Sequence, residues 1–195
     1  MSTLVEAVRP QRGSRLIAVD IAAIALGSLV VAALAQVSVR LPFTPVPITG
    51  QTLGVLLVGA SLGATRGTAA LLLYLVEGAV GLPFFAELKS GLSILAPSSP
   101  TGGYLFGFVA AASVVGLLAD RQWERDIGRA IGAMLLGELV VYLFGVPWLA
   151  AALHVSAQKA LSLGLYPFVV GDIAKLLVAA GLLPSAWRLV ARHTE

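Results

Sequence analysis

The sequence contains no cysteine and only two histidines, His154 and His193, among its 195 residues. The lack of cysteine excludes disulfides and thiolate-bound metals, and two histidines this far apart do not predict a metal centre. No lysine directly follows a glycine, so the Walker A phosphate-binding loop is excluded as well. The sequence therefore predicts no metal, no cofactor and no nucleotide site of the Walker type.

Charged residues are also scarce, at 12% of the chain, whereas about a quarter of the residues of a soluble domain are charged. Hydrophobic residues make up 58%, which predicts an integral membrane protein with one transmembrane domain over residues 1–195. The net charge of +3 would suit nucleic-acid binding, but the charges lie in short clusters between apolar runs, as in membrane-protein loops. The expected environment is the lipid bilayer, and no nucleic-acid partner is expected.

Six apolar segments predict an all-α fold with six transmembrane helices. They cover residues 16–39, 48–64, 67–82, 102–119, 130–153 and 168–189. The second and third are shorter than the roughly 20 residues that a span needs. These two segments are therefore either tilted spans or a partly re-entrant hairpin.

Arginine and lysine placement predicts that both termini are cytoplasmic, with residues 1–14 as an N-terminal segment and 190–195 as a tail. Nine of these residues then lie inside: Arg9, Arg12, Arg15, Arg66, Arg121, Arg125, Arg129, Arg188 and Arg192. Only Arg40, Lys89 and Lys159 lie outside, which is the bias of a cytoplasmic-membrane protein. The outer loops, 41–50, 83–101 and 156–167, are long and rich in proline and glycine.

One alternative is that the first segment is a cleaved signal peptide, because basic residues precede an apolar run that reaches Ala33-Leu34-Ala35. Asp20 interrupts this run, which continues to Val39 and is long for a signal peptide. We expect the segment to be retained as the first helix.

Asp172 and Lys175, three residues apart in the last segment, share one face of a helix one to two turns below the outer surface. Each costs about 2.5–3.5 kcal/mol to insert into hydrocarbon, so the pair predicts a polar site for a small molecule. The alternative is an ion pair that only sets helix packing. Asp20 is expected to reach the inner interface or pair with Arg15. Glu77 either reaches the outer interface in the same way or has a function. Glu138, which is deeper, has either a function or a hydrogen bond to another helix.

Several stretches occur together in an order that is typical of one family. They are LPFTPVPITGQT (41–52), LGA (62–64) with RG (66–67), Tyr74 with GLPFFA (81–86), PTGGYL (100–105) with GF (107–108), and GD (171–172) with Lys175. On these motifs, nearly the whole chain resembles the BioY family, the biotin-specific substrate-capture subunits (S components) of energy-coupling-factor (ECF) transporters. Residues 87–91 depart from the usual glycine-rich pattern, and residues 97–99 lengthen the loop, so the outer lid is expected to differ in shape.

The resemblance implies high-affinity capture and uptake of biotin, with no bond made or broken, so the chain is not expected to be an enzyme. It also implies a membrane coupling (T) protein and two ABC-type ATPases as partners. Ala18 and Ala22 fit the small-xxx-small spacing that such proteins use on the first helix to dock the coupling protein.

Biotin offers two ureido N–H groups, a carbonyl and a carboxylate, so its site needs an acceptor, a cation or donors, and an apolar slot. Asp172 is expected to accept the ureido N–H groups, while Lys175 either binds the carboxylate or keeps Asp172 ionised. Further candidate binding residues are Tyr104, Gly102, Gly103 and Gln51. Their alternatives are interfacial anchoring for Tyr104, a tight turn for the two glycines, and a helix cap for Gln51.

Three other functions are alternatives to biotin capture. An S component for a flat aromatic vitamin would favour stacking residues, but of the three tryptophans Trp123 and Trp187 fall on the cytoplasmic side. A channel would need a polar face along several helices, whereas the polar residues here cluster at one depth. An intramembrane enzyme would need a nucleophile–base pair or a metal set.

The topology predicts where a reporter fused to the C-terminus will be found. An enzyme that is active only in the cytoplasm should be active in this fusion, and one that is active only outside should be inactive. The opposite pattern would overturn the depth assigned to Asp172 and Lys175.

Overall fold

The computed structural model describes residues 3–4 and 15–192, with side chains described for residues 3–4 and 16–185. Most of the predicted N-terminal segment 1–14 lies outside the described residues, as does the end of the predicted tail 190–195. The backbone of residues 190–192 continues the last helix.

Each of the six predicted apolar segments lies in a helix, which confirms the all-α fold. The helices are α2 (Arg15–Gln36), α3 (Gln51–Ala79), α4 (Gly102–Ala119), α5 (Ile127–Leu153), α6 (Ala157–Gly164) and α7 (Val169–Arg192). Short 3-10 turns are η1 (Ala86–Leu88), η2 (Leu92–Ile94) and η3 (Trp123–Arg125). Residues 48–49, predicted as helix, instead form β2 (Ile48–Thr49), which pairs antiparallel with β1 (Ser38–Val39).

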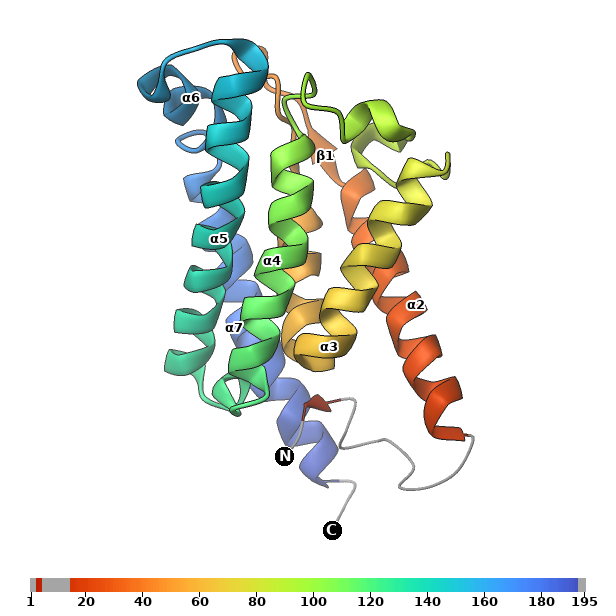
Figure 1. The fold of residues 1–195 in the computed structure, drawn as a ribbon. Helices are drawn as coiled ribbons and strands as arrows, with labels where there is room; N and C mark the ends of the chain where they lie inside the picture. Colours follow the sequence, from red (N-terminus) through yellow and green to blue (C-terminus); the bar gives the residue numbers. More distant parts are fainter. Residues whose placement is uncertain (1–2, 5–14, 193–195) are drawn as a thin grey trace.

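The second and third predicted segments are two limbs of α3, which reverses at Gly63 (Figure 1). Gly63 has φ 79° and ψ −179°, a backbone conformation open to glycine and strained for other residues. The limbs pack closely, since a Cβ on Gly67 would lie 3.0 Å from the Cα of Gly59. A Cβ on Gly116, near the end of α4, would lie 2.4 Å from the nitrogen of Ala64. The reversal of α3 is therefore packed closely against the end of α4.

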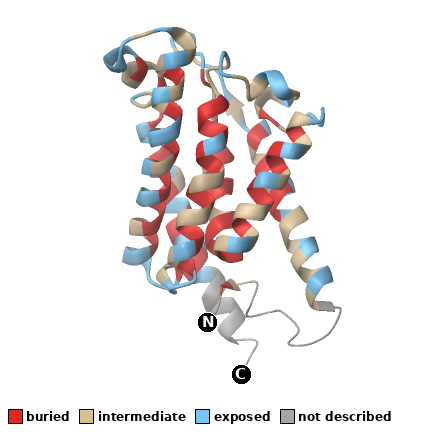
Figure 2. Cartoon of the chain, viewed as in Figure 1, coloured by how far each residue is buried: buried red, intermediate tan, exposed pale blue. Residues whose placement is uncertain are grey.

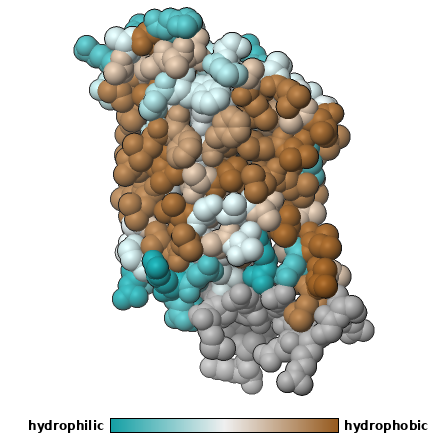
Figure 3. Space-filling view, in the orientation of Figure 1, coloured by the Kyte–Doolittle hydropathy of each residue, from teal (hydrophilic) through white to brown (hydrophobic). Residues whose placement is uncertain are grey.

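On the face shown in Figure 3, an apolar band crosses the middle of the molecule and hydrophilic side chains gather at both ends. Among the described residues, α2, α3, α4 and α5 are long and apolar enough to cross a membrane, and α6 with α7 makes a fifth candidate, bent by 52°. Buried residues lie on the facing sides of the helices (Figure 2). The chain is thus a multi-pass membrane protein.

The two ends of the bundle differ. The β1–β2 ribbon, residues 80–101 and α6 gather at one end, hereafter the loop end (Figure 1). The start of α2 and the end of α7 lie at the other end, as expected if both termini are on one side of the membrane.

The structure gives Asp20 and Glu77 specific partners. Asp20 pairs with Arg66, whose Nε lies 2.8 Å from Oδ1. The side chain of Arg15, the partner expected from the sequence, lies outside the described residues. Glu77 accepts a hydrogen bond from Ser28 and so links α3 to α2. Both carboxylates therefore hold helices together.

Gly63→Ala should destabilise the fold by about 1–3 kcal/mol, because alanine is strained in this backbone conformation. The added methyl group would also lie 2.4 Å from an oxygen of Asp120. The measurement is the unfolding temperature of the purified protein in detergent. Gly181→Ala is the matched control, since no atom lies within 4 Å of its added Cβ and its unfolding temperature should not fall. Equal stability of the two variants would show that the reversal does not depend on glycine.

Candidate ligand-binding site

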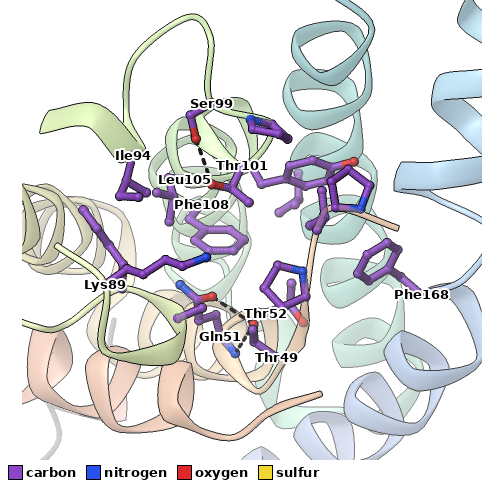
Figure 4. Close-up of a pocket in the computed structure, with 18 of the residues that line it drawn as sticks. Thr49, Gln51, Thr52, Lys89, Ile94, Ser99, Thr101, Leu105, Phe108 and Phe168 are labelled. Carbon is purple, nitrogen blue, oxygen red and sulfur yellow. Dashed lines mark hydrogen bonds between the residues drawn. The ribbon is translucent and has the colours of Figure 1, made fainter. Parts of the chain in front are cut away.

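A pocket of about 220 Å³ lies at the loop end, between the residues around β2, the loop before α4, and helices α4, α5 and α7 (Figure 4). Its walls are mainly apolar and include five aromatic rings. These are Phe85, Tyr104, Phe108, Tyr142 and Phe168. A concave apolar pocket with a few polar groups is the usual form of a small-molecule site. The tryptophan count alone did not predict so aromatic a lining.

Asp172 and Lys175 meet in this pocket, as their spacing predicts. The Nζ of Lys175 lies 2.9 Å from Oδ1 of Asp172 and 3.0 Å from the hydroxyl of Thr52 on α3. Tyr142 on α5 donates a hydrogen bond to the other carboxylate oxygen of Asp172. The side chains are only 9% exposed for Asp172 and 16% for Lys175. The charges are therefore neutralised locally, although both residues still line the pocket.

The start of α7 favours this arrangement. Asp172 is in the first turn of the helix, where the free backbone N–H groups stabilise a negative charge. Lys175 follows three residues later on the same face. One helical turn therefore presents an acceptor and a cation side by side.

Gln51 also lines the pocket, but its amide is already engaged. Its Nε2 donates to the hydroxyl of Tyr74 at 2.7 Å, and its Oε1 accepts from Thr49 at 2.9 Å. The backbone N–H of Gln51 donates to the hydroxyl of Thr49 at 3.2 Å, and the N-cap residue of α3 is Gly50, so Gln51 is not the helix cap. Gln51 contributes an ordered polar wall to the pocket.

Tyr104 forms a buried wall of the pocket and is not at the lipid interface, because it is only 7% exposed. Its hydroxyl donates to the carbonyl of Gly164 at the end of α6, at 2.7 Å. Added Cβ atoms on Gly145 and Gly164 would lie 2.4 and 2.2 Å from atoms of Tyr104. The two glycines thus leave the space that this ring occupies.

Gly102 and Gly103 do not line the pocket, contrary to the prediction from the motif. Their nearest neighbour is Trp148 of α5, which lies 3.1 Å from a Cβ built on Gly102 and 2.2 Å from one built on Gly103. They allow α4 and α5 to approach closely, while the preceding Pro100 and Thr101 reach the pocket.

The candidate docking pair Ala18 and Ala22 and the buried Glu138 all lie outside the pocket. Ala18 and Ala22 are exposed on α2, whose first half is little covered by the bundle. Glu138 is buried in α5, one turn before Tyr142, and neither of its carboxylate oxygens has a hydrogen-bond partner among the described residues. Of the two alternatives for Glu138, the hydrogen bond to another helix is therefore absent among the described residues.

Several lining residues were not predicted as site residues. Thr52 and Tyr142 complete the polar cluster, and Lys89 brings a second lysine into the pocket. Tyr142 has a weak sequence signal, since it lies one turn after Glu138 in an otherwise apolar helix. Thr52 and Phe85 lie within the family motifs, but nothing in their type or spacing marked them as binding residues.

Comparison with known proteins is consistent with this geometry. A protein-family model described as the BioY family matches residues 6–192. The chain belongs to the BioY family. Among its relatives are two proteins named "Biotin transporter BioY". That of Thermotoga maritima is 43% identical over 73% of this chain and 81% of its own, and that of Rhizobium etli is 37% identical over 83% and 89%.

A solved structure confirms the fold. It is described as the S-component for biotin from an ECF-type ABC transporter, and it superposes with a TM-score of 0.80 over 91% of this chain and 95% of that one. Sequence identity across this match is 20%.

A double-mutant cycle tests the coupling of Asp172 and Lys175. Asp172→Leu or Lys175→Met alone should each cost about 3–5 kcal/mol of stability, because each leaves one buried charge without its partner. The double variant should lose less than either single variant. The measurement is thermal unfolding of the purified proteins in detergent. Losses that simply add would contradict a coupled pair.

Proposed function

We propose that this chain captures biotin from outside the cell and is the substrate-binding S component of an ECF-type transporter in the cytoplasmic membrane. The observation that carries the proposal is the Asp172–Lys175 pair in an apolar pocket at the loop end. The names of the relatives and of the matched structure support biotin as the ligand. In this orientation the loop end faces outward and both termini are cytoplasmic.

Asp172 accepts the ureido N–H groups of biotin. Lys175 and the hydroxyl of Tyr142 each donate a hydrogen bond to this carboxylate and fix its orientation, so the acceptor is in place before the ligand arrives. The ring of Tyr104 and the ordered amide of Gln51 form walls around the bicyclic ring system. The aromatic and aliphatic lining removes the apolar parts of biotin from water.

The chain acts as a transport subunit and not as an enzyme, because capture requires no bond to be made or broken. Energy comes from partners, a membrane coupling protein and two ABC-type ATPases. The first half of α2 supports a partner in the membrane, since Ala18 and Ala22 lie exposed beside Ile17 and Ile21, which are 67% and 62% exposed. Small residues on such a face let another helix approach closely.

A different vitamin is the second candidate, because five aromatic rings in the pocket would also suit a flat ligand. A channel is less compatible with the structure, since the charged pocket residues lie at the loop end and not along a continuous path. A binding screen across vitamins separates these functions.

The proposal predicts that purified protein binds biotin without ATP, and that Asp172→Asn weakens this binding roughly tenfold to hundredfold, the usual worth of a hydrogen bond to a charged group. The measurement is the Kd by isothermal titration calorimetry. Asp126→Asn is a matched control, because Asp126 caps α5 and asparagine caps a helix equally well. It should bind biotin like the unchanged protein.

Two outcomes would overturn the proposal. Undetectable binding of biotin together with tight binding of another vitamin would exclude biotin as the ligand. Normal biotin binding by the double variant Asp172→Leu, Lys175→Leu would mean that the pair is structural.

A further inference from the structure

Lys89 is a second cation in the pocket and comes from the loop between α3 and α4. Figure 4 shows Lys89 and Phe168 on opposite sides of the pocket, with the Lys89 side chain extending inward toward Gln51 and Phe108. Asp172 follows Phe168 by one helical turn, because its N–H donates to the Phe168 carbonyl at 2.8 Å. Lys89 and the Asp172–Lys175 pair therefore approach the pocket from different sides.

Lys89 belongs to a triad of charges with Glu87 and Arg40. The guanidinium of Arg40, which follows the β1 strand, donates to both carboxylate oxygens of Glu87. This hydrogen bonding lowers the pKa of Glu87 to about 2, so the carboxylate is ionised at physiological pH. The Nζ of Lys89 lies 2.8 Å from Oε2 of the same carboxylate. Two cations share one anion, and the triad keeps a net charge of +1.

The backbone of the loop holds this triad in position. Phe85 and Lys89 form an isolated antiparallel bridge, in which the Phe85 N–H donates to the Lys89 carbonyl at 3.0 Å. Between them Glu87 and Leu88 have φ of 63° and 58°, values that are uncommon outside glycine. Gln36 at the end of α2 supports this turn, because its Oε1 accepts from the Leu88 N–H at 3.0 Å. These hydrogen bonds hold the backbone of the turn in place, and with it the starting points of the side chains of Glu87 and Lys89.

The two lysines of the pocket differ in how far their charge is compensated. Lys175 is balanced by Asp172 and is largely buried. Lys89 is 48% exposed, and its partner Glu87 already carries the bidentate contact from Arg40. An ammonium has three donors, so Lys89 can keep its contact with Glu87 and still bind a second anion. Lys89 is thus the better available cation for an incoming carboxylate.

We propose that Lys89 binds the carboxylate of the ligand and makes the pocket prefer an acid over its uncharged analogue. Glu87 positions the ammonium, and Arg40 balances the charge of Glu87. This inference rests on the proposed function, because it takes the ureido ring to lie against Asp172 and the acid chain to point toward the loop. The binding residue comes from the segment 87–91 in which this sequence departs from the glycine-rich family pattern.

The test compares the Kd of biotin with that of biotinamide, in which an uncharged amide replaces the carboxylate. The unchanged protein should bind biotin at least about tenfold more tightly than the amide, as expected for a hydrogen bond between charged groups. Lys89→Met should weaken biotin binding by about the same factor and leave biotinamide binding within roughly twofold. Lys89→Arg, which keeps the charge, should restore most of the preference for biotin.

Lys159→Met is the matched control, because Lys159 is an exposed lysine at the loop end that does not line the pocket. It should leave both dissociation constants unchanged. If Lys89→Met kept the preference for biotin, or weakened both ligands equally, the carboxylate assignment would be wrong while biotin capture itself would stand. If the unchanged protein bound neither ligand, the proposed function and this inference would both fail.

Discussion

The ion pair between Asp172 and Lys175 is the constraint around which this end of the bundle is organised. Burying either charge alone would cost several kcal/mol, so both must find partners inside the protein. Lys175 reaches Thr52 on α3 as well as Asp172, and Tyr142 reaches Asp172 from α5. Two helices from distant parts of the sequence, α3 and α5, therefore converge on one turn of α7. The pocket lies where they converge, because polar groups satisfied from three directions form a fixed surface for a ligand.

Close packing shapes the rest of the pocket. Lipid supplies no strong drive for helices to associate, so small residues that let helices approach are the main source of tight packing. Gly103 admits Trp148, whose indole N–H donates to the Ser99 carbonyl at 2.9 Å and so ties the loop before α4 to α5. Gly145 admits Tyr104, whose hydroxyl holds the end of α6. Gly103, expected from the motif to contact a ligand, thus makes room for Trp148, and Gly145 makes room for Tyr104, which lines the pocket.

Periodicity and chemistry predicted the features that are local in sequence. The six apolar segments, the shared face of Asp172 and Lys175, and the family all follow from runs or spacings that the chain displays directly. The reversal at Gly63 was only one of two expected forms, because its geometry depends on contacts with α4. The pairing of Asp20 with Arg66 was not predicted, because the two residues are 46 positions apart and their contact leaves no local pattern. Thr52 and Tyr142 were missed for the same reason, since a hydrogen bond across 120 or 30 residues leaves no pattern in the sequence.

The charges of the pocket are arranged asymmetrically, and this asymmetry favours one orientation of a bound ligand. Near α7 the charges of Asp172 and Lys175 cancel. This side of the pocket therefore favours ligand groups that donate hydrogen bonds to the carboxylate of Asp172. At the loop, Arg40 and Lys89 outnumber Glu87, so the local field attracts an anion. A molecule with donors at one end and an acid at the other is therefore favoured in one orientation only. Because Arg40 and Lys89 are far more exposed than the pair on α7, they are also the charges that an anion arriving from water meets first.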